Sequence, residues 1–216
     1  MGNVREKIRH SLSDAGEVSK PMDRSHIAVF LDRDGTINVD VDFLVSPNQL
    51  QIIPRSDSAI RELNNLNVKV FIVTNQSGIA RGFLTEQTLA EIHRELSLQL
   101  QRKEAHIDEY YYCPHLPGVD DTRYNVECEC RKPKPGMLIQ AAREHNVNLR
   151  QSFIIGDRCR DVETGKAAGV STVMVATGYG ASEQNDCSFT ADYFASDLFD
   201  AVQFVKKTIL TREQPL

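Results

Sequence analysis

Short apolar runs recur along the chain, and between them lie longer segments in which apolar residues fall at helical spacing. Most of the runs are rich in Val, Ile and Phe, a composition typical of strands buried on both faces of a parallel sheet. They occupy residues 26–32, 68–74, 107–113, 152–157 and 171–176, and a shorter run follows at 191–196. The pattern therefore predicts six strands.

The intervening segments carry apolar residues three and four positions apart, which is the period of one helix face. Such spacing predicts helices around residues 60–66 and 89–100, the second with Thr85 as its N-cap, and further helices at 136–146, 161–169 and 197–207. Because strand and helix alternate, we expect an α/β fold with a doubly wound, mainly parallel sheet of the Rossmann-like type and helices on both faces. Its ligands should lie at the carboxyl ends of the strands.

The length of 216 residues suits a single domain, which we place at residues 26–216. Residues 1–25 hold too few apolar side chains to offset the entropy of ordering, so we expect a disordered polar extension. We find no apolar core of a signal peptide and no run of 18 apolar residues. A net charge of -5 disfavours nucleic acid and anionic membranes as partners. We expect a cytoplasmic monomer that binds a small molecule.

Three of the five cysteines gather with a histidine in one loop, residues 113–130. Cys113, His115, Cys128 and Cys130 match the ligands of a closed tetrahedral zinc site, which leaves no position for water and is therefore structural. The alternatives are a redox pair at Cys128 and Cys130, or unconnected thiols. The acidic net charge counts against a zinc-ribbon nucleic-acid module.

The remaining two cysteines, Cys159 and Cys187, stand apart from this loop. Disulfides are rare in a reducing compartment, and a free cysteine usually behaves as a small apolar residue. We therefore expect both to be unpaired thiols.

Carboxylates follow two of the predicted strands. Asp32 and Asp34 come directly after the first run, and residues two apart in an extended chain project to the same side, so both can reach one site while Arg33 points away. Asp157 ends a later run, and Asp161 follows one helical turn later. Carboxylates this close repel each other unless a cation lies among them. Mg²⁺ is the hard divalent ion that most often accompanies phosphate.

Hydrogen-bond donors and cations complete the same edge of the predicted sheet. The second run ends in Thr74, and the polar residues 75–77 and a glycine follow, a stretch that can cradle a phosphoryl group. Arg131 and Lys132 supply local positive charge. One carboxylate can attack phosphorus to form an aspartyl-phosphate, and a second can protonate the leaving alkoxide and then activate water. The alternative from another class is a catalytically inactive, zinc-stapled binding module.

The stretch DRDGT at 32–36, Thr74, Lys132 and the stretch GDRCRD at 156–161 resemble, in order, the four motifs of the haloacid dehalogenase (HAD) phosphatases. By that resemblance Asp32 is the nucleophile and Asp34 the acid/base. The resemblance further implies a catalytic Mg²⁺ held by Asp32, by the backbone carbonyl of Asp34 and by Asp157. Thr74 and Lys132 would bind the phosphoryl group, and Asp161 would orient Lys132.

The helices, strands and loops of the core account for nearly all the residues between these motifs, so we expect no cap domain. Specificity should then come from residues 38–47 and from the cysteine loop. The stretches CPH, CECRKPKPGM and TNQSGIARG are similar to those of capless HAD phosphatases that act on heptose bisphosphates or on histidinol phosphate. The long cysteine loop favours removal of the 7-phosphate from D-glycero-D-manno-heptose 1,7-bisphosphate, in ADP- or GDP-heptose biosynthesis. Histidinol-phosphate hydrolysis is the alternative.

This resemblance also implies which side chains bind the substrate. Arg131 would recognise the second, non-reacting phosphate. Arg158 is either a further phosphate ligand or a solvated surface residue. The sugar would be contacted by Asp40, Asp42, Phe43, Asn75, Gln76 and Ser77.

Overall fold

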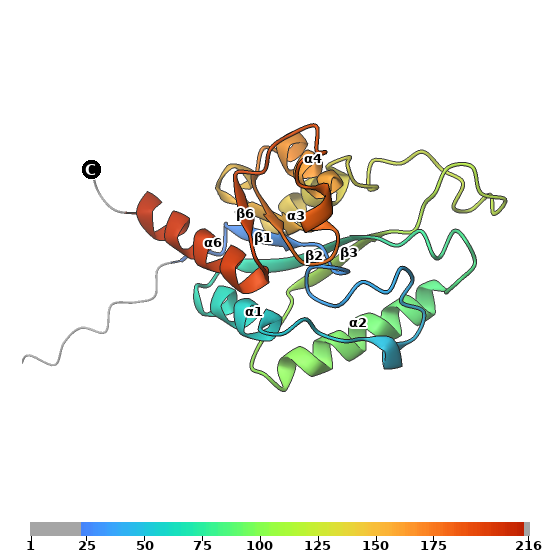
Figure 1. The fold of residues 1–216 in the computed structure, drawn as a ribbon, viewed down its shortest axis with the longest axis horizontal. Helices are drawn as coiled ribbons and strands as arrows, with labels where there is room; N and C mark the ends of the chain where they lie inside the picture. Colours follow the sequence, from blue (N-terminus) through green and yellow to red (C-terminus); the bar gives the residue numbers. More distant parts are fainter. Residues whose placement is uncertain (1–22, 214–216) are drawn as a thin grey trace, which may run out of the picture.

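The computed structural model describes residues 23–213, in which a six-stranded parallel sheet is flanked by helices (Figure 1). The strands are β1 (Ala28–Leu31), β2 (Lys69–Asn75), β3 (Glu109–Cys113), β4 (Phe153–Gly156), β5 (Ser171–Val175) and β6 (Tyr193–Ala195). The helices are α1 (Ser56–Asn65), α2 (Glu86–Gln101), α3 (Gly136–His145), α4 (Cys159–Ala168), α5 (Gly180–Glu183) and α6 (Leu198–Arg212), with the 3-10 turns η1 (Pro47–Gln49) and η2 (Leu149–Gln151).

Alternate residues of the strands build two cores, one on each face of the sheet. In β1, Val29 and Leu31 pack with the apolar faces of α1, α2 and α6. Ala28 and Phe30 point to the other face and pack with α3, which lies on the same side as α4 (Figure 1). Both sets are fully buried because helices cover both faces, as the unbroken apolar runs predict.

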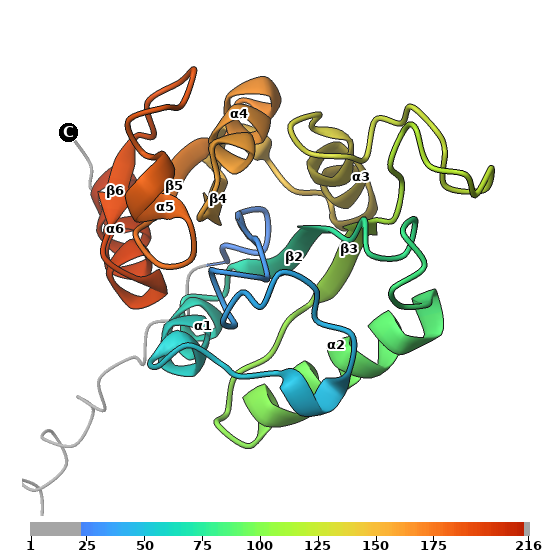
Figure 2. The same cartoon turned by 45° about the vertical axis from the view of Figure 1, so that its right-hand side comes forward.

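The strand order is β3-β2-β1-β4-β5-β6. The chain first winds outward from β1 through β2 to β3, then returns to β4 on the other side of β1. Leu31 is in register with Ile72 of β2 and Ile155 of β4, so β1 and β4 end within one residue of each other while β2 continues to Asn75. The crevice at such a reversal of direction is where doubly wound sheets bind their ligands. Figure 2 shows the loops that follow β1 and β2 above this edge.

The expected doubly wound parallel sheet is confirmed, with every predicted strand and helix present. Thr85 caps α2 as expected, because its side chain accepts a hydrogen bond from the backbone N–H of Thr88. The short elements η1, η2 and α5 were not predicted, because they are too brief to show a hydrophobic period. The last helix was predicted to end at residue 207, whereas α6 continues to Arg212.

The N-terminal extension predicted for residues 1–25 falls mostly outside the described residues, which begin at residue 23. Arg24 forms an ion pair with Glu213, with 2.7 Å between Nε and Oε1, and this contact ties the start of the described chain to its end. Within residues 23–213, the helices all lack the length and apolar character needed to cross a membrane.

Candidate active site

A pocket of about 380 Å³ opens at the carboxyl ends of β1, β2 and β4. Its lining includes the carboxylates and the threonine predicted from the strand ends, Asp32, Asp34, Thr74 and Asp157. All eight predicted substrate contacts also line it: Asp40, Asp42, Phe43, Asn75, Gln76, Ser77, Arg131 and Arg158. The described chain inserts no cap domain over this pocket, so it stays open to solvent as expected.

A buried lysine lies against Asp32, which lines the pocket. The Lys132 side chain is fully buried, and its Nζ lies 3.0 Å from Oδ2 of Asp32 and 2.5 Å from Oδ1 of Asp161. Burial alone would lower the pKa of Lys132, but the charges of Asp161 and Asp32 outweigh it and raise that pKa. The ammonium group therefore stays charged against Asp32, and Asp161 fixes its direction from beneath.

The side chain of Asn75 holds the backbone of the lysine segment. Its Nδ2 donates to the carbonyl oxygen of Lys132 at 3.0 Å, and its Oδ1 accepts from the Lys132 N–H at 3.0 Å. Both ends of the amide are thus engaged within the protein. Asn75 lines the pocket, but its hydrogen bonds position Lys132.

Three carboxylates meet where a cation would fit. The ligand atoms of Asp32, Asp157 and Asp161 lie within 4.8 Å of one another. Oδ1 of Asp157 is buried and has no hydrogen-bond partner among the described residues. Burial, followed by the charges of Asp32 and Asp161, raises the pKa of Asp157 to about 8. A hard cation among these oxygens would satisfy the orphaned atom and remove the repulsion.

The backbone around Asp157 leaves room for its carboxylate only because two glycines lack a side chain. A Cβ on Gly35 or Gly178 would overlap the Asp157 carboxylate, and both residues have positive φ, at 77° and 57°. The other oxygen of Asp157, Oδ2, accepts from the backbone N–H of Tyr179 at 2.9 Å. The carboxylate is therefore held in place through Oδ2, and Oδ1 is left without a partner.

Asp34 is held differently from Asp32, and here one expectation was wrong. Arg33 does not point away: its guanidinium turns back and binds both oxygens of Asp34, with Nη2 at 2.9 Å from Oδ1 and 2.7 Å from Oδ2. The extended-chain reasoning fails because the chain leaves the strand at Asp32 and enters a turn. The three-carboxylate cluster accordingly contains Asp161 and not the Asp34 carboxylate.

Gln76 links Asp34 to the end of β2. Its Nε2 donates at 3.0 Å both to Oδ2 of Asp34 and to Oγ1 of Thr74. Burial of Asp34 favours a raised pKa, but the Arg33 charge and the hydrogen bonds from Asn38, Arg33 and Gln76 outweigh burial, and the pKa of Asp34 is lowered. The carboxylate is therefore ionised and firmly oriented.

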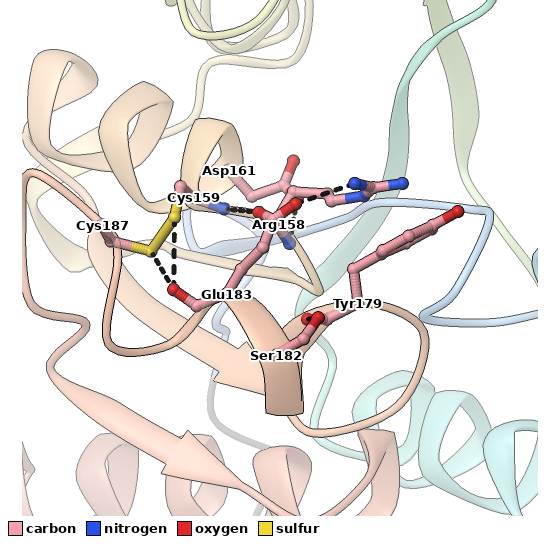
Figure 3. Close-up of a disulfide and its surroundings, with 7 residues drawn as sticks. All are labelled: Arg158, Cys159, Asp161, Tyr179, Ser182, Glu183 and Cys187. Carbon is pink, nitrogen blue, oxygen red and sulfur yellow. Dashed lines mark hydrogen bonds and ion pairs between the residues drawn. A yellow bond between two sulfur atoms is a disulfide. The ribbon is translucent and has the colours of Figure 1, made fainter.

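Arg158 is half-buried in a network of its own (Figure 3). Its Nη1 lies 2.7 Å from Oε1 of Glu183, its Nη2 lies 3.7 Å from Oδ2 of Asp40, and its guanidinium carbon lies 3.1 Å from the centre of the Tyr179 ring. Of the two readings of Arg158, the solvated surface residue is wrong. The network joins α4, α5 and the loop around residue 40.

Tyr179 extends this network across the pocket. Its hydroxyl donates to Oδ1 of Asp42 at 3.3 Å, while its backbone N–H holds Asp157. Tyr179 and Glu183 were not predicted, because neither stands near a motif. Arg160 was not predicted either: it lines the pocket, and its guanidinium forms no hydrogen bond or ion pair with the other residues of 23–213. The position of Arg160 inside the GDRCRD stretch was a usable signal.

Cys159 and Cys187 form a disulfide, so the expectation of two unpaired thiols was wrong. Their Cα atoms lie 5.0 Å apart, and the bond joins the first residue of α4 to the segment that follows α5. Both sulfurs lie near the backbone carbonyl of Glu183, whose carboxylate accepts from the Cys159 N–H at 2.9 Å (Figure 3). Spacing alone cannot reveal such a pair, because α4, β5 and α5 lie between the two cysteines in sequence and only the fold brings them together.

The four ligand candidates of the cysteine loop come together as predicted. The sulfur atoms of Cys113 and Cys130 lie 3.6 and 3.2 Å from that of Cys128, and His115 Nδ1 lies 3.7 and 3.4 Å from the sulfurs of Cys113 and Cys130. A tetrahedron with Zn–S bonds of about 2.3 Å has S···S edges of about 3.8 Å, so the cluster is close to the size that zinc requires. The three cysteines are not disulfide-bonded.

Hydrogen bonds connect the cysteine loop to the pocket wall, and one of them holds Arg131. Nη1 of Arg131 donates to the carbonyl oxygen of His115 at 3.0 Å. Arg131 also follows Cys130 directly and lines the pocket. The loop therefore determines where this arginine points.

Comparisons with known proteins agree with this geometry. Residues 129–201 match a HAD-hydrolase-like family model. The chain is 37% identical over 186 residues to the D-glycero-beta-D-manno-heptose-1,7-bisphosphate 7-phosphatase of Yersinia pestis, covering 86% of this chain and 98% of that protein. It is 36% identical over 187 residues to the enzyme of the same name from Escherichia coli K12, covering 86% and 97%.

Solved structures lead to the same group. A D,D-heptose 1,7-bisphosphate phosphatase from B. bronchiseptica, solved with magnesium and phosphate, superposes with a TM-score of 0.75 at 33% identity, covering 84% of this chain and 99% of that one. The D,D-heptose 1,7-bisphosphate phosphatase of Burkholderia thailandensis gives a TM-score of 0.63 at 26% identity, covering 82% and 97%.

The disulfide should contribute measurably to stability. Replacing Cys159 and Cys187 together by Ser should lower the free energy of unfolding by about 3–4 kcal/mol, because the bond closes a loop with a sequence separation of 28 residues. Urea denaturation of oxidised and reduced wild-type protein should show a similar loss. The double variant is the control, since reductant should not destabilise it further. Equal stability of oxidised wild type and variant would contradict the pairing.

Proposed function

Because the chain belongs to the D-glycero-beta-D-manno-heptose-1,7-bisphosphate 7-phosphatase family of HAD-like hydrolases, we propose that it removes the 7-phosphate of that sugar bisphosphate. The observation that supports this most directly is Asp32, a strand-end carboxylate paired with a buried lysine and open to a pocket with arginines on its wall. The names of the relatives favour the β anomer. The proposal includes a monomeric enzyme of the cytoplasm.

Asp32 is the proposed nucleophile. One of its oxygens attacks phosphorus and the bond from phosphorus to the sugar oxygen breaks. The departing alkoxide takes a proton from Asp34, which binds that proton from solvent before this step because it is ionised in the free pocket. Water then attacks the aspartyl-phosphate, Asp34 takes a proton from that water, and phosphate leaves with Asp32 restored. Lys132 offsets the negative charge of the transferring group, Thr74 donates a hydrogen bond to it, and Asp161 keeps Lys132 in place.

Mg²⁺ fits this site as its cofactor. Asp32, the backbone carbonyl of Asp34 and Asp157 would hold the ion, which when bound would offset negative charge on the nucleophile and on the phosphoryl group. The orphaned Oδ1 of Asp157 and the raised pKa of this carboxyl support a cation here. The B. bronchiseptica structure, which contains magnesium and phosphate, supports the same assignment.

The rest of the pocket supplies substrate recognition. The sugar would be contacted by Asp40, Asp42, Phe43 and Ser77. Asn75 and Gln76 also line the pocket, but their side-chain amides form hydrogen bonds with other groups of the protein. Arg131 would bind the non-reacting phosphate. Arg160 would join it, because these two residues flank the ion pair of Lys132 and Asp161 in sequence and both line the pocket.

We expect phosphate release from heptose 1,7-bisphosphate to be Mg²⁺-dependent and much faster than from histidinol phosphate, with kcat/KM for the two substrates measured side by side. Both anomers of the bisphosphate should be compared. EDTA should abolish turnover, and so should Asp32→Asn, while the melting temperature shows that the fold is kept. A preference for histidinol phosphate would show that the proposed substrate is wrong, while the proposed catalytic residues would stand. No Mg²⁺-dependent release across a sugar-phosphate panel would favour an inactive binding module.

Replacing Arg160 by Gln should raise KM for the bisphosphate about tenfold or more, since a charge-assisted contact to the second phosphate is lost. The rate with a sugar monophosphate should not change, because that substrate has no second phosphate. Arg94→Gln, an exposed charge change on α2, is the matched control. An equal effect on both substrates would show that Arg160 does not recognise the second phosphate.

The cysteine cluster is the proposed site of a structural zinc ion. Cys128→Ser should therefore reduce the zinc content of the purified protein and lower its melting temperature. Because the loop holds Arg131, KM for the bisphosphate should also rise. Metal analysis and thermal unfolding of wild type and variant provide the check. Equal melting temperature and activity with and without zinc would contradict a structural role.

A further inference from the structure

Behind Asp34 lies a chain of buried and half-buried polar side chains that the proposed reaction does not use. It runs from Arg33 to His93 of α2 and then to Tyr110 of β3 and Ser97. Polar groups are costly to bury, so a connected set directly behind a reacting carboxylate calls for an explanation.

Arg33 grips Asp34 from the protein side. The arginine side chain is 0% exposed, whereas that of Asp34 is 25% exposed and faces the pocket. Three hydrogen bonds reach the carboxylate from this one guanidinium, at 3.2 Å from Nε to Oδ1 and at 2.9 and 2.7 Å from Nη2 to Oδ1 and Oδ2. A planar fork that contacts both oxygens fixes the rotation of the carboxylate as well as its position.

His93 in turn holds Arg33. Its Nε2 lies 3.4 Å from Nη1 of Arg33. Because a guanidinium has only donors, Nε2 must be the acceptor, so the ring is neutral with its proton on Nδ1. Burial and then the charge of Arg33 lower the pKa of His93 to about 3, in agreement with a neutral ring.

The imidazole ring is itself locked from behind. It stacks on Tyr110, with 4.6 Å between ring centroids and 23° between planes. The Tyr110 hydroxyl lies 2.8 Å from Oγ of Ser97, which donates to the His93 carbonyl oxygen at 3.0 Å. The chain of contacts therefore runs without a gap from the interior of α2 to the carboxylate at the pocket wall.

We propose that Arg33 and His93 are positioning residues for the acid/base step: His93 fixes the guanidinium of Arg33, and Arg33 fixes the Asp34 carboxylate toward the bound substrate. This inference rests on the proposed role of Asp34. Asn38 and Gln76, at 2.9 and 3.0 Å from Oδ1 and Oδ2, hold the carboxylate from other sides but leave its rear to Arg33. A proton must leave and return to the same oxygen in the two steps, so loss of orientation should slow turnover without weakening substrate binding.

The test uses His93, which touches neither substrate nor metal ligand. His93→Leu removes the acceptor, and it should lower kcat about tenfold or more with KM within about twofold of wild type. His93→Gln returns an acceptor near the position of Nε2, and it should recover most of kcat. Arg94→Gln, the exposed neighbour on α2, should match wild type. If His93→Leu fails to fold, Arg33→Lys decides, because lysine keeps the charge but cannot bind both oxygens.

A purely structural role is separated by a double-mutant cycle. In an Asp34→Asn background, His93→Leu should change the residual rate less than about twofold, because its effect passes through Asp34. An unchanged kcat in folded His93→Leu, no rescue by Gln, or the same fold loss in both backgrounds would overturn the inference. Normal turnover by Asp34→Asn alone would instead overturn the acid/base role in the proposed function, and the inference with it.

Discussion

The buried ammonium group of Lys132 is the contact on which the site depends. It lies between Asp32, which reaches it from the end of β1, and Asp161, which reaches it from the first turn of α4. Taking a lysine fully out of water is unfavourable unless carboxylates surround it, and removing one partner of such a group typically costs about 3–5 kcal/mol. The same pair therefore joins two elements of the fold and sets a positive charge against Asp32.

The path of the lysine segment is fixed at several points because it belongs to no regular element. Asn75 bonds both backbone groups of Lys132 from the end of β2, and the cysteine loop begins where β3 ends at Cys113. The bond from Arg131 to the His115 carbonyl connects that loop to the pocket wall. A zinc ion in the cysteine cluster would cross-link this loop and make it a rigid wall of the capless pocket.

Strand ends were predictable because parallel strands that are neighbours finish at one edge, which brings Asp32, Thr74 and Asp157 together in any such sheet. The cysteine loop was equally readable, because its ligand types and spacing allow few alternatives. The directions of side chains in turns could not be predicted. Strand β1 ends at Leu31, so Asp32, Arg33 and Asp34 are not part of an extended strand, and the Arg33 side chain folds back onto Asp34. The disulfide and the contacts of Tyr179 depend on how α4 and α5 approach each other, which no local pattern encodes.

The pocket must accept an anion although its wall carries many carboxylates. Several of these carboxylates are paired with a cationic side chain. Asp32 is compensated by Lys132, Asp34 by Arg33, and Asp40 by Arg158 at the longer distance of 3.7 Å. Asp157 has only a distant contact with Arg158, at 3.9 Å to Oδ2, and its Oδ1 has no partner in the described chain. Within the described chain, Asp157 thus has no cation at hydrogen-bond distance, and its Oδ1 is left without a partner. A divalent ion beside Asp157 would make this carboxylate part of a binding site for phosphate, and it would leave Arg131 and Arg160 available for a second anionic group farther along the wall.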